Sequence, residues 1–298
     1  MTTPPDISTP LIPYPNQTPV TGPQNLGYLN DFIGTWNSPT GTAATGFNVM
    51  PLPQTTAPGG YILKNFPYYE EITFSPIAGG APNRAGSFTQ SSGVLFYEQR
   101  VFFAPGPGVP ASAVDTLIHA ENGTWLYHNI GPQLDGPFGP GTVPPPPGGI
   151  PAQNPADQYN KQVSVPHGNS LLMLGQAYEL GGGIPGYPNP PAMPPFTGGH
   201  QPVPDPADAL RRAAQGLGNI VRAVRIDVGT QGPGGVSNIP FEQQNGQVLS
   251  MWTSWFILYL DDGTTRLQYW QNIVLQFMIG GQPVQFAHVD ANTLSKVA

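Results

Sequence analysis

Segments rich in aromatic and β-branched residues, with polar residues interspersed, recur along most of the chain. Gly, Pro, Asn and Asp bound these segments, a pattern typical of β-strands joined by turns. The predicted strands are residues 47–52, 68–74, 94–103, 115–120, 124–129, 161–165, 170–176, 219–228, 247–260 and 264–279. A closing strand near residues 285–288 is expected to pair with the first strand.

Three turn signals predict how these strands are connected. Asn122-Gly123 favours positive φ at both positions and therefore predicts a two-residue hairpin. Pro166-His167-Gly168-Asn169 and Asp261-Asp262-Gly263 predict two further hairpins. Antiparallel strands joined in sequence predict an all-β fold, an antiparallel meander β-barrel, with a β-sandwich as the competing architecture.

One short helix is predicted within this strand-rich chain. It covers residues 207–217, with Asp205 as the N-cap and Pro206 in the first helical position. Residues 1–24 contain seven prolines and are expected to form an extended arm. Residues 25–298 are predicted to form a single barrel domain with two long Pro/Gly-rich loop insertions, 131–155 and 181–204.

Composition narrows the classes of partner and compartment. The chain has 298 residues, of which 38 are Gly and 39 Pro, and its formal net charge is −7. An acidic chain without a basic cluster is not expected to bind nucleic acid. The absence of Cys excludes disulfides and thiolate chemistry. No signal peptide or apolar membrane span is evident, so we expect a soluble, cytoplasmic protein. The sequence leaves open whether the chain forms homo-oligomers.

The run Gly34-Thr35-Trp36 precedes the predicted strands and is typical of the start of small barrels that hold an apolar ligand. The glycine lets the chain turn, and the Trp36 indole is expected to close one end of the barrel while its N–H finds an acceptor. Further short segments, here called islands, follow in order along the chain. They are residues 70–74 (Glu-Glu-Ile-Thr-Phe), 97–100 (Tyr-Glu-Gln-Arg), 119–123 (His-Ala-Glu-Asn-Gly), and His288 ahead of Ala291 and Leu294.

Together these islands, which span roughly residues 28–296, resemble the lipocalin-like haem-binding β-barrels similar to nitrobindin. The long Pro/Gly-rich loops depart from the compact family pattern and indicate a divergent branch. In those barrels a histidine near the C-terminus binds the haem iron. The resemblance therefore implies haem as the cofactor and His288 as the iron ligand. As an alternative, His288 is an edge-strand side chain that faces water.

His119 and Glu121 are two residues apart, and if the predicted strand 115–120 continues to Glu121, both side chains share a face. Such a pair could bind a metal or act as base and orienter, and His128 or His167 from a neighbouring hairpin could add a third group. The plainer alternative is that Glu121 caps the Asn122-Gly123 turn and that His119 makes one hydrogen bond.

His167 lies at a predicted hairpin tip, where it either contacts a ligand at the barrel mouth or simply belongs to the turn. Arg84 follows Pro82-Asn83 in a predicted loop, where its guanidinium could clamp a ligand carboxylate or satisfy loop carbonyls.

Three functions are compatible with this sequence. The first is binding of a hydrophobic small molecule, haem included, with Trp36, Arg84 and His288 as the binding residues. The second is a cofactor-independent enzyme that acts on an apolar or natural-product-like substrate by acid–base chemistry at His119, Glu121 and His167. The third is an interaction protein whose Pro-rich arm and loops bind partners in extended form.

Overall fold

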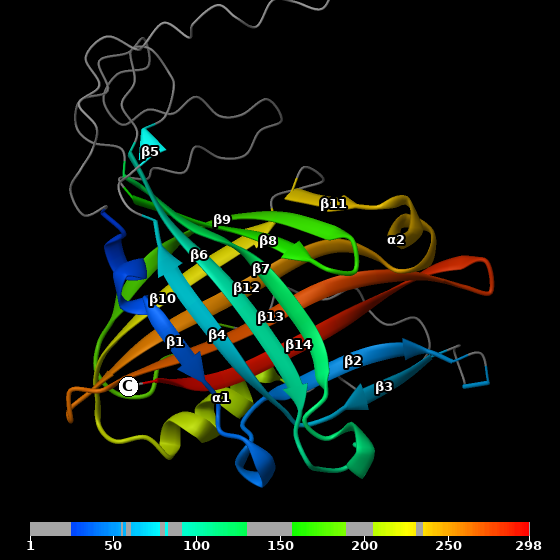
Figure 1. Ribbon diagram of the computed structural model, residues 1–298, viewed down its shortest axis with the longest axis horizontal. Helices are drawn as coiled ribbons and strands as arrows, with labels where there is room; N and C mark the ends of the chain where they lie inside the picture. The colour runs from blue at the N-terminus through cyan, green and yellow to red at the C-terminus, as the bar shows by residue number, and fades with distance from the viewer. Residues whose placement is uncertain are drawn as a thin grey trace, which may run out of the picture.

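Ten antiparallel strands close into a β-barrel in this computed structural model, and further strands extend the sheet (Figure 1). The structure describes residues 25–54, 56–57, 61–77, 81–82, 91–129, 157–188, 205–230 and 235–297. The barrel strands are β1 (Gly34–Asn37), β4 (Tyr68–Pro76), β6 (Ser91–Phe103), β7 (Leu117–Asn129), β8 (Asp157–Val165), β9 (Asn169–Leu180), β10 (Ile220–Thr230), β12 (Gln247–Leu260), β13 (Thr265–Ile279) and β14 (Gln282–Lys296).

The remaining elements decorate this barrel. The strands outside the closed circuit are β2 (Phe47–Pro53), β3 (Tyr61–Asn65), β5 (Ala81–Pro82) and β11 (Val236–Asn238). The helices are α1 (Pro206–Gln215) and α2 (Pro240–Asn245), with the short 3₁₀ helices η1 (Gly27–Phe32), η2 (Gly41–Ala43) and η4 (Ala111–Ala113). The predicted arm 1–24, the predicted loop 131–155, part of the predicted loop 181–204, and Arg84 lie outside the described residues.

Closure depends on the short strand β1, which pairs with β4 on one side and with β14 on the other. Trp36 is opposite Ile72 of β4 and opposite Lys296 of β14. The predicted meander barrel is therefore confirmed, and the β-sandwich alternative is wrong. The last strand also pairs with the first, as predicted, but through Ser295 and Lys296 of β14, whereas the predicted residues 285–288 pair with β13. The middle of β14, residues 289–291, pairs with β2, where Val289 is opposite Val49.

The predicted hairpin at Asn122-Gly123 is wrong, because both residues lie inside the continuous strand β7. Gly123 is required there for close packing and not for a turn. A Cβ at this position would lie 1.9 Å from the carbonyl oxygen of Gln162 in β8, so only glycine lets the two backbones approach. The other two predicted hairpins are confirmed, between β8 and β9 and between β12 and β13.

One half of the barrel interior is filled by aromatic side chains. The Trp255 ring stacks on Tyr269 with 4.6 Å between centroids and meets Trp125 edge-on at 5.7 Å. Phe32 of η1 packs against the same cluster, and Trp36 is fully buried and donates its indole N–H to the Phe32 carbonyl oxygen at 2.7 Å. This end of the barrel is therefore closed, as the Gly-x-Trp run predicted.

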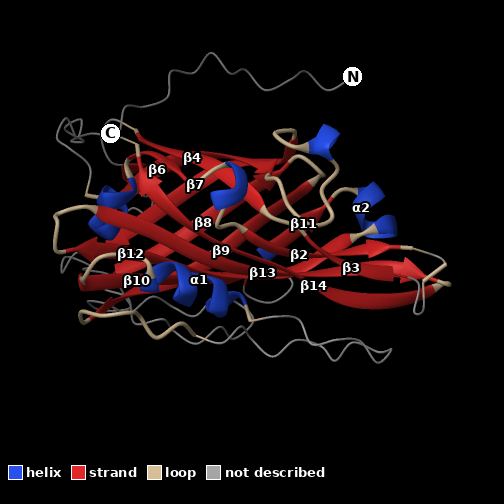
Figure 2. Ribbon diagram, turned by 90° about the horizontal axis from the view of Figure 1, so that it is seen from below, coloured by secondary structure: helices blue, strands red, loops and turns tan. Residues whose placement is uncertain are grey.

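A second, smaller core lies on the outside of the barrel, under α1. Leu210 and Ala214 of the helix pack with Phe256, Leu258 and Trp270 on the outer face of β12 and β13. The helix begins as predicted, because Asp205 accepts a hydrogen bond from the backbone N–H of residue 207 at 2.9 Å. Figure 2 shows α1 against the sheet, and α2 toward the opposite end of the molecule, beside β11.

Candidate functional site

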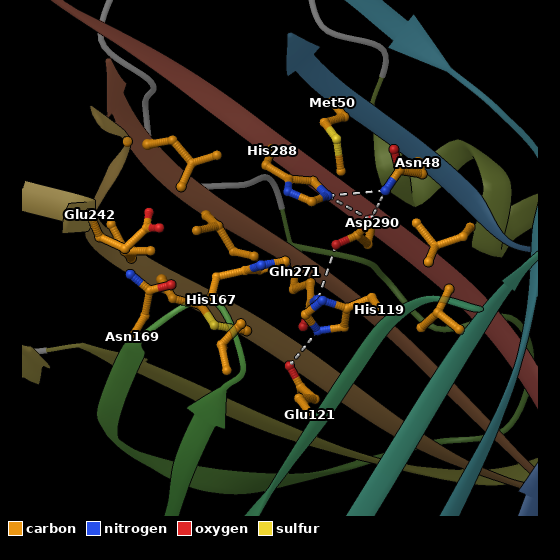
Figure 3. A pocket seen from close by; sticks show the side chains of 18 of the residues that line it. Asn48, Met50, His119, Glu121, His167, Asn169, Glu242, Gln271, His288 and Asp290 are labelled. Carbon is orange, nitrogen blue, oxygen red and sulfur yellow. Dashed lines mark hydrogen bonds and ion pairs between the residues drawn. The ribbon is translucent and has the colours of Figure 1, made fainter. Parts of the chain in front are cut away.

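The half of the barrel away from the aromatic cluster holds a cavity of about 410 Å³. The strands β2, β4, β6, β7, β8, β9, β12, β13 and β14 contribute its wall, and Phe241 and Glu242 of α2 also line it. The wall is mainly apolar: its apolar side chains are Met50, Leu52, Phe66, Val101, Ile118, Val165, Leu171, Phe241, Val248, Met251, Ile273, Leu275 and Phe277. Against this wall stand two pairs of histidine and carboxylate (Figure 3).

The first pair is His119 and Glu121, which alternation along β7 brings to the same face. The His119 Nε2 lies 3.4 Å from Glu121 Oε2. The other carboxylate oxygen of Glu121 accepts from the Tyr97 hydroxyl at 2.9 Å and from the ammonium of Lys161 at 3.2 Å. Lys161 is fully buried, behind the cavity wall. A buried carboxylate thus meets a buried cation, a hydroxyl and an imidazole.

These contacts set the charge of the first pair. Burial alone would raise the pKa of the Glu121 carboxyl, but the Lys161 ammonium and then His119 outweigh it and lower that pKa to about 2. Burial likewise acts to lower the pKa of His119, whereas the hydrogen bond and negative charge of Glu121 raise it above its ordinary value. At neutral pH Glu121 is therefore ionised and favours the protonated imidazolium of His119.

The second pair is His288 and Asp290 on β14. The His288 Nε2 lies 3.2 Å from Asp290 Oδ1 and 3.0 Å from Asn48 Nδ2. Asn48 Nδ2 donates to Asp290 Oδ1 at 2.5 Å, and Gln271 Nε2 donates to the other oxygen at 3.0 Å. Burial acts to raise the pKa of Asp290, but the charge and hydrogen bond of His288 outweigh it and lower that pKa.

The two pairs face the same space. Asp290 lies between the rings of His288 and His119 in Figure 3. The negative charge of Asp290 also acts to raise the pKa of His119, as expected for groups that share one cavity. The His167 ring adds a third imidazole, with its centroid 5.9 Å from that of His119.

Beneath the cavity lies a buried carboxyl that is linked to it through tyrosines. Both oxygens of Glu70 accept from the Tyr269 hydroxyl, at 2.8 and 2.9 Å, and Asn292 Nδ2 donates at 2.6 Å. Tyr269 lines the cavity, and its hydroxyl lies 3.2 Å from that of Tyr68, which also lines it. Burial raises the pKa of Glu70 to about 7, although its hydrogen-bond donors act to lower it.

The structure brings four of the predicted site residues together: His119, Glu121, His167 and His288 all line the cavity. It does not bring the Trp36 side chain there, because the indole is enclosed in the aromatic end of the barrel. His128 is also elsewhere, with its Nδ1 2.8 Å from Asn160 Nδ2.

Sequence reasoning missed the polar residues that complete the site, namely Asn48, Glu70, Lys161 and Asp290. One signal for them was present. His288 and Asp290 repeat the His-x-acid spacing of His119 and Glu121, so one histidine and one carboxylate share a face on each of two strands. Nothing in the sequence indicated that Lys161 turns into the barrel.

The residues of this site offer few ligands to a metal ion or a haem. Among the described residues, no group of three or more His, Cys, Asp and Glu side chains is placed to hold a metal ion. The His288 Nε2 is already engaged by Asp290 and Asn48. The described cavity lining also contains no Lys or Arg to pair with the two propionates of a haem. The residues therefore fit haem poorly.

Comparisons with known proteins add no relative: no family model, no curated protein and no solved structure matches the chain. The resemblance to nitrobindin stays a prediction. In the described part of the chain, no helix combines the length and apolar character needed to cross a membrane.

Proposed function

We propose that this protein binds a small, largely apolar molecule inside its barrel, with the polar end of that molecule among the histidine–carboxylate pairs. The observation that carries the proposal is the cavity of about 410 Å³ between the aromatic cluster and α2. Ligand pockets typically span about 300–1,000 Å³ and combine apolar walls with a few convergent polar groups. An apolar wall facing His119, Glu121, His288 and Asp290 matches that description.

Titration with a neutral fluorescent probe, N-phenyl-1-naphthylamine, tests this proposal. We expect saturable binding of one probe per chain and displacement by unlabelled apolar molecules. The Leu275→Trp variant places an indole in the cavity and should weaken binding at least tenfold. The matched control Val221→Trp changes an exposed side chain of β10 and should bind as the unaltered protein does. Equal binding by both variants, with native melting temperatures, would contradict the proposal.

The resemblance implies haem as the ligand. The lining residues support haem less well than they support another apolar molecule. Haem would need His288 to release its partners and would need counter-charges for its propionates outside the described lining. The test is a Soret band on addition of hemin that His288→Ala abolishes. If the protein ignores hemin but still binds the neutral probe, haem is excluded while the binding function stands.

A second candidate function, acid–base catalysis in the same cavity, is favoured by the contact between His119 and Glu121. A carboxylate that orients an imidazole and raises its pKa is the arrangement of a general acid or base. His167 is the nearest further imidazole that could assist. Proton exchange at a carbon next to a ketone is a minimal reaction for such a site.

Proton NMR in D₂O with 2-decanone tests this candidate. An exchange rate above that of buffer, abolished in His119→Gln but retained in the surface control Arg100→Gln, would support catalysis. Exchange no faster than in buffer, although 2-decanone displaces the neutral probe, would reject acid–base catalysis on ketones at this site.

A further inference from the structure

The two ring nitrogens of each histidine in the pairs are used differently. In His119 and in His288 the Nε2 faces a carboxylate, whereas no described residue forms a hydrogen bond with the Nδ1. Neither Nδ1 is among the enclosed side-chain atoms that lack a hydrogen-bond partner, in contrast to Asn48 Oδ1. The His119 side chain keeps 29% of its surface exposed while its ring lines the cavity. Its Nδ1 is therefore free and open to a molecule in the cavity.

Glu121 decides which hydrogen-bonding group this nitrogen presents. The carboxylate lies 3.4 Å from the His119 Nε2 and is ionised beside the Lys161 ammonium, so the Nε2 carries a hydrogen and donates it. When the ring is protonated, its second hydrogen is on Nδ1. Lys161, Glu121 and His119 together then carry one net positive charge. The cavity therefore contains a positively charged N–H donor that is free to bind an acceptor.

The surrounding charges keep His119 protonated at mildly acidic pH. Burial and the Lys161 charge act to lower the pKa of His119, but Glu121 and Asp290 together outweigh them and raise it above the ordinary value of 6.5. The other titratable groups of the described lining are Tyr68 of β4, His167 of the β8–β9 turn, Glu242 of α2, Tyr269 of β13 and His288 of β14. At pH 6, below that raised pKa, the His119 ring is mainly protonated.

The carboxylates of the two pairs already have their donors. Glu121 accepts from a hydroxyl and an ammonium and meets the His119 ring, and Asp290 accepts from two amides and meets the His288 ring. An ammonium ligand would lose its hydration without finding an uncompensated carboxylate. A carboxylate ligand would meet the negative charges of Asp290 and Glu242, with no Lys or Arg in the described lining to offset them. An uncharged acceptor incurs neither cost.

We propose that the ligand carries an uncharged carbonyl group whose oxygen accepts a hydrogen bond from His119 Nδ1, with the apolar part of the ligand along the wall. This inference rests on the proposed binding function and specifies the class of ligand: an apolar ketone, aldehyde or ester. Hydrogen bonds with a charged donor are roughly twice as strong as neutral ones. The exposed ring of His167, with its centroid 5.9 Å from that of His119, places a second imidazole near the same oxygen.

Four molecules that share a phenyl ring and a four-carbon chain test the carbonyl, by displacement of the neutral probe at pH 6. Butylbenzene has no polar group, butyrophenone adds one carbonyl oxygen, and 4-phenylbutanoate and 4-phenylbutylamine each add a charge. We expect butyrophenone to bind most tightly, at least tenfold more tightly than either charged molecule. If any of the other three binds as tightly or more tightly, the carbonyl assignment is overturned while the binding function stands. Failure of the probe itself to bind would instead overturn the binding function.

A matched pair of variants then locates the hydrogen bond. His119→Leu keeps an apolar side chain but removes the donor, so the preference for butyrophenone over butylbenzene should fall at least tenfold. His128→Leu is the control, because His128 is also on β7 but lies outside the cavity lining, with its Nδ1 beside Asn160. It should leave the preference unchanged. An unchanged preference in a folded His119→Leu protein would overturn the assignment to this ring. The ranking of the four molecules in the unaltered protein decides the carbonyl assignment even if that variant does not fold.

Discussion

Replacing Lys161 by Met tests the electrostatics behind the cavity wall. The Lys161 side chain is fully buried, its Nζ lies 3.2 Å from Glu121 Oε1, and it lies over the rings of Tyr97 at 4.8 Å and Trp255 at 5.4 Å. Met has a similar length and keeps the apolar contacts, but Glu121 loses its fixed cation. Removing one partner of a buried ion pair typically costs roughly 3–5 kcal/mol.

The lowered pKa of Glu121 gives a second, independent value for the stabilisation of the folded state by this carboxylate. A fall from the ordinary value of 4.5 to about 2 corresponds to roughly 3 kcal/mol of stability. The sign follows from proton linkage: this contribution is complete above pH 4.5 and is lost as the pH falls from 4.5 toward 2. In Lys161→Met the acid-dependent loss should shrink or reverse, because the Glu121 pKa then rises.

Urea unfolding at pH 7, followed by tryptophan fluorescence, measures the effect. We expect Lys161→Met to lose roughly 3–5 kcal/mol and the double variant with Glu121→Gln to recover part of that loss. Lys64→Met, at an exposed position, is the control and should stay within about 0.5 kcal/mol of the unaltered protein. A loss below about 1 kcal/mol in Lys161→Met, or additive losses in the double variant, would refute the reasoning.

Three further predictions concern single residues. Because Glu70 keeps its proton to about pH 7 in the folded state, stability should fall by roughly 3 kcal/mol between pH 4.5 and 7, and Glu70→Gln should remove that slope in urea unfolding. Gly175→Ala places a Cβ 1.7 Å from the carbonyl oxygen of Asp227 and should cost roughly 3 kcal/mol or more; a native melting temperature would contradict this. Asp205→Ala removes the N-cap of α1 and should cost about 1 kcal/mol in thermal unfolding, with no effect on probe binding.

The sequence predicted the barrel because local patterns determine most of it. Strand composition and two turn signals located the paired strands, and Asp205-Pro206 located the start of α1. The prediction failed at Asn122-Gly123, where the turn signal was strong but a tertiary requirement prevailed. Gly123 lies where β8 approaches β7 too closely for a side chain, and no local pattern distinguishes that need from a turn.

The candidate site was only half predictable for a related reason. His119 and Glu121 share a face by alternation along a single strand, so their pairing could be inferred. The partners of these residues come from other strands: Lys161 lies on β8, the neighbour of β7 in the sheet but 40 residues away in sequence from Glu121, and Asn48 lies on β2, 240 residues from His288. Such contacts depend on barrel closure and register, which one sequence does not specify. For Trp36, one part of the prediction was right and one was wrong. The Gly-x-Trp run correctly predicted that the indole closes one end of the barrel, but nothing in the sequence indicated that this end lies away from the cavity.

The half of the barrel next to α2 is hollow, and we propose that it receives an apolar ligand. A crystal structure with the neutral ligand 12-bromododecan-1-ol tests this most directly, because bromine is located by its anomalous signal. We expect one strong bromine peak inside the barrel, within contact distance of lining residues such as Phe241, Phe277 or Leu275. A bromine found only on the outer surface, or a lumen filled by side chains with no ligand density, would contradict the claim.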